Sequence, residues 1–213
     1  MDQPDPNADL LRRVKEGDQQ ALADLFSLHR DRLWRIINFR LDSRLLGRVD
    51  ADDILQEAYL AAAQRIEHYL DDSTQTFFIW LRLISNQTLI DVHRRHLGAK
   101  MRDASREMSI RAHYAQATSM SIASQLLGNF TSPSQVAMRD EVAAQLDKAI
   151  ESMEPIDREV LALRHFEELS NSEVAEVLEI QQKAASIRYV RALKRLKDVV
   201  NKIPGFADNK LLG

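Results

Sequence analysis

The 213-residue sequence has no cysteine and only 6 glycines and 5 prolines. The lack of cysteine excludes disulfides, thiol nucleophiles and cysteine-ligated zinc. The scarcity of glycine and proline, beside abundant alanine, leucine, arginine and glutamate, favours helices. No apolar run approaches the length of a membrane-spanning helix, and the polar, acidic start MDQPDPNADL does not resemble a signal peptide. We therefore expect a helical, cytoplasmic protein without membrane insertion.

Helical periodicity is interrupted over residues 98–134, which are rich in Ser, Ala and Met and end in TSPS. A structureless stretch of this length is unusual inside one domain. We predict an all-α fold of two small helical domains joined by a flexible linker. The predicted segments are a tail over 1–8, a domain over 9–97, the linker over 98–134, a domain over 135–203 and a tail over 204–213. A short helix over Ile122 to Leu127 and a resumed helix near Pro133 to Met138 are also expected.

Residues 169–197, LSNSEVAEVLEIQQKAASIRYVRALKRLK, have the layout of a helix-turn-helix. Ser170 or Asn171 can cap a short first helix. A break at residues 179–181 separates this helix from a second one that begins near Gln182. The interior positions of the second helix recur at steps of four, three and four residues: Ala185, Tyr189, Ala192 and Leu196. In such motifs the first helix supports the second in the major groove of DNA.

Positive charge is concentrated on the second helix of this motif. Residues 183–202 include seven lysines and arginines and one acidic residue, Asp198, although the whole chain has a net charge of -3. Most of the charged residues in the preceding segment, 151–179, are acidic. A solvated basic face on an ordinary helical hairpin would give the same pattern. A basic helix directly after a break with helix-turn-helix spacing nevertheless favours DNA binding.

The first domain is expected to contain long amphipathic helices. Asp18 can cap one of them, and another opens at Asp50 with an acidic first turn, as the helix dipole favours. On this second helix Asp53, Gln56 and Glu57 face outward together. Taken alone, that is an ordinary polar helix face.

A loop over residues 70–76 precedes a helix predicted from Phe77 to about Leu97. The helix begins with an aromatic group, Phe77, Phe78 and Trp80, of which we expect two to lie in the core. The alternative is a stacking platform for single-stranded nucleic acid, beside the basic residues at the end of the helix.

The end of this helix reads HRRH and includes residue types that bind metals. Asp91, His93 and His96 could be grouped as ligands, but their spacing is loose, and Arg94 and Arg95 lie between the histidines. We therefore predict no metal site here.

Three passages of the chain match the patterns of one family, in the same order. Residues 51–59, ADDILQEAY, match an acidic helix with the pattern ED-[LI]-[VI]-QE-x-[FY]. The frame W-L-x-x-I…D-x-x-R-R is matched by Trp80, Leu81, Ile84, Asp91, Arg94 and Arg95. Residues 161–196 match LxLR…LS-x-x-E-[IV]-A-x-x-L-x-I…R-x-x-RA-x-x-x-L. On these motifs the chain resembles the extracytoplasmic-function (ECF) sigma factors of bacterial RNA polymerase, over nearly all of residues 9–203.

The resemblance implies recognition without catalysis and without a cofactor. The domain over 9–97 would be sigma region 2, which docks on core polymerase and reads and opens the −10 element. The domain over 135–203 would be sigma region 4, which reads the −35 element. The implied partners are the clamp helices of the largest polymerase subunit, the polymerase flap, promoter DNA and an anti-sigma factor.

The resemblance also assigns residues to each contact. Docking on the clamp helices is assigned to Asp53, Gln56 and Glu57. The −10 element, including an extruded base, is assigned to Asp72, Ser73, Thr74, Trp80, Gln87, Arg94 and Arg95. The −35 element is assigned to Lys183, Ser186, Ile187, Arg188, Val190, Arg191, Lys194 and Arg195. Of these, Lys194 and Arg195 are better placed for phosphates than for bases.

Two parts of the chain depart from the family pattern. Gln87 stands where an Asn is usual, with Asn86 one place earlier; Gln offers the same donor and acceptor one carbon further out. In the basic helix, Lys183-Ala184 replaces a usual Gly-Thr pair, and Ser186-Ile187 replaces a common basic-Ser pair. The departures in the basic helix imply a specialised −35 sequence.

Two other functions fit parts of the sequence. A stand-alone helix-turn-helix regulator would bind duplex DNA without polymerase, but it leaves the outward face of Asp53, Gln56 and Glu57 without a role. An enzyme, such as a hydrolase that uses His93 and His96, would lack a Gly-rich phosphate loop, a nucleophile elbow and a complete metal set. We therefore predict a protein that is not an enzyme.

Overall fold

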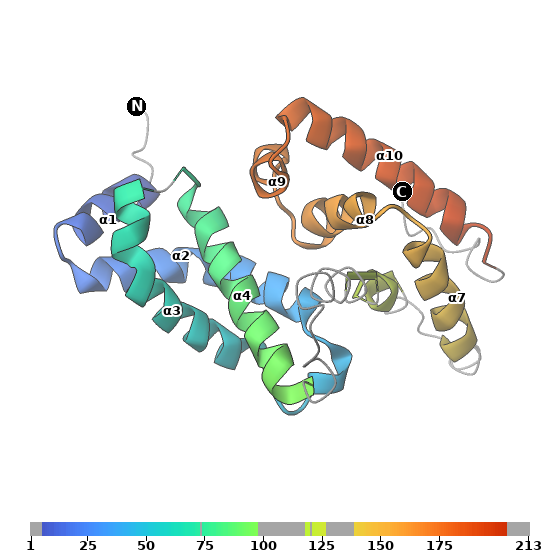
Figure 1. Cartoon of the computed structure of the whole chain (residues 1–213), viewed down its shortest axis with the longest axis horizontal. Coiled ribbons are helices and arrows are strands. Elements are labelled where there is room, and N and C mark those ends of the chain that lie inside the picture. The colour runs from blue at the N-terminus through green and yellow to red at the C-terminus, as the bar shows by residue number, and fades with distance from the viewer. Residues whose placement is uncertain (1–5, 73, 98–117, 120, 127–138, 204–213) are drawn as a thin grey trace, which may run out of the picture. The chain divides into compact units, whose positions relative to one another are not determined.

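The computed structural model describes residues 6–72, 74–97, 118–119, 121–126 and 139–203. These residues form helices joined by short turns, and no strand occurs among them, so the all-α prediction is confirmed. The chain divides into two compact units, residues 1–100 and 101–213. Figure 1 labels the helices of both units, which are described separately below.

The first unit is built from four α-helices and one short 3-10 turn. Their bounds are α1 (Pro6–Lys15), α2 (Gln19–Arg40), η1 (Ser43–Leu45), α3 (Ala51–Asp72) and α4 (Phe77–Leu97). The predicted tail over 1–8 therefore includes the start of α1, where a proline suits the first helical position. Asn7 is tied down as well, because its Oδ1 lies 3.0 Å from Nε2 of His29 on α2.

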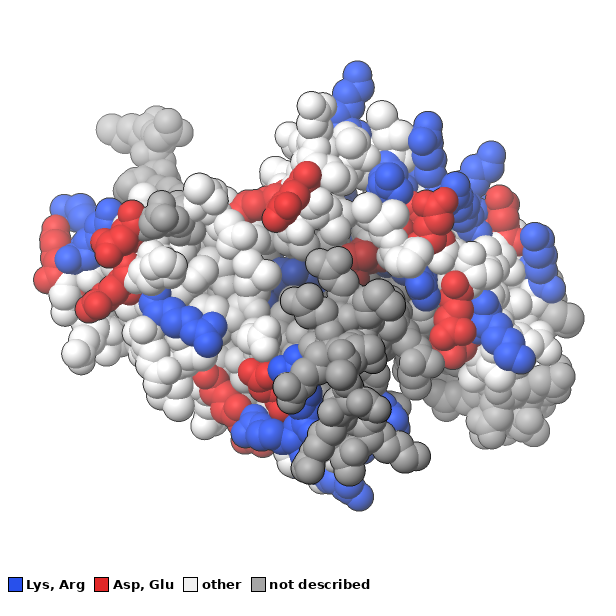
Figure 2. All heavy atoms as spheres, in the orientation of Figure 1, with Lys and Arg blue, Asp and Glu red and all other residues white. Residues whose placement is uncertain are grey.

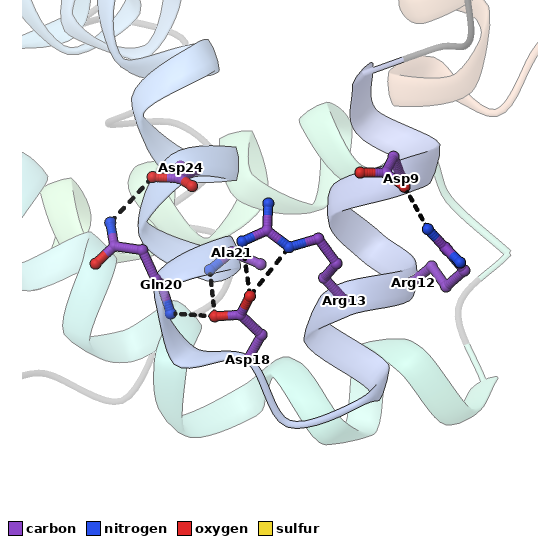
Figure 3. Close-up of polar contacts among 7 residues, drawn as sticks. All are labelled: Asp9, Arg12, Arg13, Asp18, Gln20, Ala21 and Asp24. Carbon is purple, nitrogen blue, oxygen red and sulfur yellow. Dashed lines mark hydrogen bonds and ion pairs between the residues drawn. The ribbon is translucent and has the colours of Figure 1, made fainter.

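The turn between α1 and α2 is fixed by local chemistry (Figure 3). Gly17 has φ +89°, a left-handed conformation that glycine adopts without strain. Asp18 caps α2, as predicted, since its Oδ1 accepts hydrogen bonds from the backbone N–H groups of Gln20 (2.9 Å) and Ala21 (3.2 Å). Arg13 on α1 donates to the other oxygen at 2.7 Å, and these bonds lower the pKa of the Asp18 carboxyl.

In the core of the first unit, α2 and α4 both pack against α3 and against each other. The side chains that meet there recur at helical spacing on each element. They include Leu25, Leu33, Ile36 and Ile37 of α2, Ile54, Ala58 and Ala62 of α3, and Leu81, Ile84 and Leu89 of α4. This packing holds the outward faces of α3 and α4 in a fixed relation.

The second unit contains the helix-turn-helix. Its elements are α7 (Arg139–Glu151), α8 (Pro155–Leu161) with the π-helical turn η2 (Ala162–Phe166), α9 (Asn171–Leu178) and α10 (Gln182–Val200). Ser170 caps α9 in a capping box with Glu173, and Glu179 ends the helix in a left-handed conformation, φ 54°. The predicted break at 179–181 and the start of the second helix at Gln182 are confirmed.

In the second unit α10 packs against α7, α8 and α9. Ala185, Ala192 and Leu196 are buried, as the spacing predicts, whereas Tyr189 is half-buried. Leu146, Ile150, Val160, Leu161, Leu163 and Val174 of the other elements in this unit are fully buried as well. Small alanines let α10 approach its neighbours closely, so the helix is held firmly.

Part of the predicted linker is helical. Residues 118–119 and 121–126 are helical, and Ile122, Ala123 and Leu126 are buried. The Ser119 hydroxyl accepts a hydrogen bond of 2.7 Å from Arg158 on α8. The short helix expected over Ile122 to Leu127 is thus present over the described residues, and this part of the segment is anchored rather than loose. The helix expected near residues 133–138 lies outside the described residues. Residues 98–117 of the predicted linker and the predicted tail over 204–213 lie outside them as well.

Candidate functional site

The three residues assigned to docking lie exposed on one face near the start of α3. Asp53, Gln56 and Glu57 are all exposed, and the Asp50 carboxylate accepts a hydrogen bond from the Asp53 N–H at 2.9 Å. Together with Arg95 and other residues of α3 and α4, they line a hollow of about 350 Å³. Carboxylates in the first turn favour the helix through its dipole and leave an acidic surface open to a basic partner.

One residue assigned to DNA is paired with a docking residue. Arg95 Nη2, on α4, lies 2.6 Å from Oε2 of Glu57 on α3. Both side chains are about half exposed, 54% and 45%, so the pair lies in contact with water. One ion pair therefore joins a residue assigned to polymerase docking, Glu57, to a residue assigned to the −10 element, Arg95.

The other polar residues of α4 that are assigned to the −10 element converge on Asp91. Gln87 is exposed, and its amide donates to Asp91 Oδ1 at 3.3 Å, while Arg94 Nη1 lies 3.3 Å from the same oxygen. Asn86 is buried, and its Oδ1 has no hydrogen-bond partner among the described residues. Gln87 stands where the family usually has Asn, and Asn86 precedes it. Of these two amide side chains, only that of Gln87 is exposed to a ligand.

The aromatic start of α4 divides as predicted between core and surface. Phe77 and Phe78 are buried, and Trp80 is half-buried. The Trp80 ring packs on Tyr69 of α3 and on Phe77, with ring centroids 4.7 and 5.5 Å apart. Trp80 therefore stands at the edge of an aromatic cluster and retains accessible surface on which a base could stack.

The residues before α4 are only partly a loop. Asp72 is the last residue of α3, so the helix extends three residues into the predicted loop of 70–76. Ser73 lies outside the described residues, and Thr74 is exposed. The Tyr69 hydroxyl donates to the backbone oxygen of Gln75 at 3.2 Å, which ties this turn to the aromatic cluster.

The histidines of α4 have different surroundings. His93 is buried, and its Nε2 accepts a hydrogen bond of 3.3 Å from the backbone N–H of Asp42, while His96 is exposed. His93 thus satisfies a backbone donor at the turn after α2. No group of three His, Cys, Asp or Glu side chains that could hold a metal is found within the described part of the chain.

The outer face of α10 combines basic and apolar side chains. Lys183, Ile187, Val190, Arg191 and Lys194 recur at helical spacing, and all are exposed; Ser186, at the edge of this face, is half-buried. Ile187 and Val190 are 44% and 63% exposed, which is unusual for large apolar side chains. Figure 2 shows Lys and Arg side chains gathered along α10. Such a face can contact phosphates and base edges of a major groove.

Two arginines assigned to DNA lie on the flank of α10 that faces α8. Arg188 Nη1 is 3.2 Å from Oδ1 of Asp157, and Arg195 Nη1 contacts Oδ2 of the same carboxylate. Asp157 is almost fully buried, with 3% of its side chain exposed. Asp157 is not among the residues predicted from the sequence. Its only sequence signal is the seven-residue spacing of the two arginines, which places them on one side of a helix.

The family was tested by comparison with known proteins. A model described as ECF sigma factor matches residues 6–201. The chain belongs to the ECF sigma factor family. Among curated relatives, this ECF sigma factor is 27% identical over 188 residues to the ECF RNA polymerase sigma factor SigW of Bacillus subtilis (strain 168), covering 88% of this chain and 92% of the relative. It is 24% identical over 191 residues to the ECF RNA polymerase sigma-E factor of Escherichia coli (strain K12), covering 90% and 92%.

A solved structure shares the fold of this ECF sigma factor. The structure of CnrH in complex with the cytosolic domain of CnrY aligns with a TM-score of 0.51 at 21% identity, covering 96% of this chain and 100% of the other. Within the part of the chain that the structure describes, no helix is both long and apolar enough to cross a bilayer.

Proposed function

We propose that this ECF sigma factor binds core RNA polymerase and directs initiation at promoters with particular −35 and −10 elements. The observation that carries the proposal is the outer face of α10. A capped helix-turn-helix presents Lys183, Arg191 and Lys194 beside two exposed apolar residues. This arrangement suits a duplex major groove, where cations neutralise phosphates and apolar groups contact thymine methyls.

In this proposal the first unit supplies the polymerase contact and the −10 contact. The acidic face of Asp53, Gln56 and Glu57 would meet basic residues of the clamp helices. Trp80 and Gln87, on the neighbouring α4, would take up the opened strand; stacking and hydrogen bonds would offset the few kcal/mol that extruding a base costs. Arg94 and Arg95 would neutralise its phosphates.

Two DNA-reading modules held on one polymerase bind a promoter more tightly than either module alone, because each raises the effective concentration of the other at the DNA. Each module alone would bind DNA weakly, but tethering both on core polymerase makes the second contact intramolecular. The flap of core polymerase would position the −35 module. Binding energy would serve recognition and strand opening, so we assign no catalytic residue and place the protein's action in the cytoplasm with its polymerase.

A regulatory protein is also part of the proposal. The solved structure of CnrH with the cytosolic domain of CnrY shows that a protein of this fold can be held by a second protein. A partner that occupies the docking face of Asp53, Gln56 and Glu57 would compete with polymerase. Such a partner should block transcription in a purified assay, which tests this competition.

Transcription in vitro with purified core polymerase and a library of genomic fragments tests the proposal most directly. We expect a defined set of start sites that depends on this chain. Identical start sites with and without the chain would refute the proposed function. A tight, sequence-specific gel shift by the chain without core would favour the stand-alone regulator instead.

A further inference from the structure

Asp157 of α8 connects the middle and the last part of α10. Its two carboxylate oxygens are used separately, because Oδ1 accepts from Arg188 and Oδ2 accepts from Arg195. The exposed carboxylate of Glu154 adds weaker contacts, 4.0 Å from Arg188 and 3.6 Å from Arg195. Two positive and two negative charges therefore balance at this flank of the helix.

The burial of Asp157 determines where its partners can go. A carboxylate with 3% of its side chain exposed has lost most of its water and depends on its partners for compensation. If both arginines moved to DNA phosphates, a buried charge would be left unpaired, which is costly. Retaining Arg188 and Arg195 at Asp157 is therefore favoured even when α10 lies on DNA.

Three other cations of α10 have no such anionic partner in the part of the chain that the structure describes. Lys183, Arg191 and Lys194 are exposed on the outer face, and none of the three forms an ion pair with a described residue. They can bind phosphates or bases without giving up an existing partner. The helix thus carries two classes of basic residue, one compensated and one available.

We propose that Asp157 is a positioning residue that holds Arg188 and Arg195 away from DNA, so that α10 reads the −35 element with its outer face alone. This inference rests on the proposed function of α10. It assigns Arg188 and Arg195 a role different from the one that the family resemblance gives them. Specificity improves because two flexible cations that could bind any phosphate are removed from the interface.

Binding to a short mixed-sequence DNA duplex at several low salt concentrations tests the inference with the full chain. The slope of log K against log salt reports how many phosphates are neutralised, at about 0.9 per contact on duplex DNA. In Asp157→Asn both arginines lose their anionic partner, so we expect a slope steeper by up to about 1.8 and tighter non-specific binding. A residue with a purely structural role would not steepen this slope.

The matched control is Asp198→Asn, which removes the same charge from an exposed position on α10. This variant should keep the wild-type slope, because no arginine is released. Asp157→Glu keeps the carboxylate and should keep a slope near that of the wild type. Equal steepening in Asp157→Asn and Asp198→Asn, or an unchanged slope in a folded Asp157→Asn, would overturn the inference.

Arginine variants provide a test if Asp157→Asn fails to fold. In the wild-type background, Arg195→Gln should leave the slope unchanged, whereas Arg191→Gln should flatten it by about 0.9. Flattening by Arg195→Gln would show that Arg195 contacts phosphate and would refute the inference.

Selection of promoter templates by the holoenzyme measures the specificity of α10 for the −35 element. From templates with a randomised −35 segment, Asp157→Asn should select a broader set of sequences than the wild type. An equally narrow set would count against the inference. If the wild-type chain failed to direct initiation with core, the proposed function would be wrong, while the salt slopes on duplex DNA would still report on the role of Asp157.

Discussion

Arg95 on α4 is paired with Glu57 on α3 at 2.6 Å, so a residue assigned to the −10 strand is held by a residue assigned to polymerase docking. The pair is about half exposed on both sides, and such pairs contribute only about 0.2–1 kcal/mol to stability. A basic group of polymerase that engages Glu57 can therefore displace Arg95 at little cost. Docking and DNA binding would then be coupled through this one contact.

Charge reversal at Glu57 tests the docking surface. Glu57→Lys should abolish holoenzyme formation, because it places a positive charge opposite a basic partner. The free energy of unfolding should change by less than about 1 kcal/mol, since the ion pair that is lost is solvent-exposed. Pull-down of core polymerase by the tagged chain measures the first effect, and urea unfolding measures the second.

The control for this experiment is Glu67→Lys. Glu67 is exposed on the same helix and undergoes the same change of charge, but it lies outside the hollow lined by Asp53, Gln56 and Glu57. It should bind core normally. Normal core binding by Glu57→Lys as well would disprove the docking assignment.

The capping box at the start of α9 makes a separate prediction about stability. Ser170→Ala removes the hydroxyl that accepts from the Glu173 N–H at 3.2 Å, and should cost about 1 kcal/mol. Ser172→Ala, two residues later, removes a hydroxyl that lies 2.9 Å from the Ser170 hydroxyl but caps no backbone group, and it should cost less. Thermal unfolding of the two variants checks the difference; an equal loss in both would mean that the cap does not limit the stability of this unit.

Local sequence signals predicted the helices well. The cap at Asp18, the aromatic start of α4 and the break before α10 depend on neighbouring residues, and the structure has each where it was expected. The main error concerns a segment without such signals, because the start of α1 was assigned to a tail. The helical residues at 121–126 were expected, although they lie in a segment with little periodicity.

Contacts between distant residues could not be predicted in this way. Glu57 and Arg95 are 38 positions apart, and Asp157 is 31 and 38 positions from its two arginines. Motifs assigned these arginines to DNA by position on a helix, but the packing of α10 against α8 decides which way they are held. The family resemblance predicted the surfaces, and tertiary packing determines which of their side chains are available.

The turn after α2 predicts a pH dependence of stability. The pKa of the Asp42 carboxyl lies below its ordinary value of 3.8, chiefly because the Arg44 side chain donates hydrogen bonds to it, at 2.9 Å and 2.6 Å. A carboxyl with a lowered folded-state pKa stabilises the fold above the pKa of the unfolded chain. That contribution is lost as the pH falls through the folded-state value.

Arg44→Gln should therefore lower the free energy of unfolding at pH 7. The difference from the wild type should shrink as the pH falls below about 4, where the unfolded chain binds a proton at Asp42 before the folded protein does. Urea unfolding from pH 7 to pH 3 measures this trend, and Arg48→Gln, an exposed arginine in the same turn region, is the control. A difference that did not change with pH would mean that Arg44 stabilises the turn by packing rather than by its charge.

The exposed amide of Gln87 predicts a defect in promoter opening. Gln87 is held by a 3.3 Å hydrogen bond to Asp91 and lies on the surface of α4, so Gln87→Ala should change stability by less than about 0.5 kcal/mol. If the amide binds a base of the opened −10 strand, its loss should reduce transcription from duplex templates. The control is Gln64→Ala, which removes an exposed amide from α3.

A template with a mismatched, already open −10 segment separates two roles of Gln87. If Gln87 only assists strand separation, opening the template in advance should restore transcription by Gln87→Ala to the wild-type level. If it reads a base, the defect should persist and depend on the base at one position, because an amide pairs with the donor and acceptor pattern of a particular base. We expect the second result, since Gln87 is exposed while the neighbouring Asn86 is buried. Wild-type activity of Gln87→Ala on both templates would remove Gln87 from the −10 site.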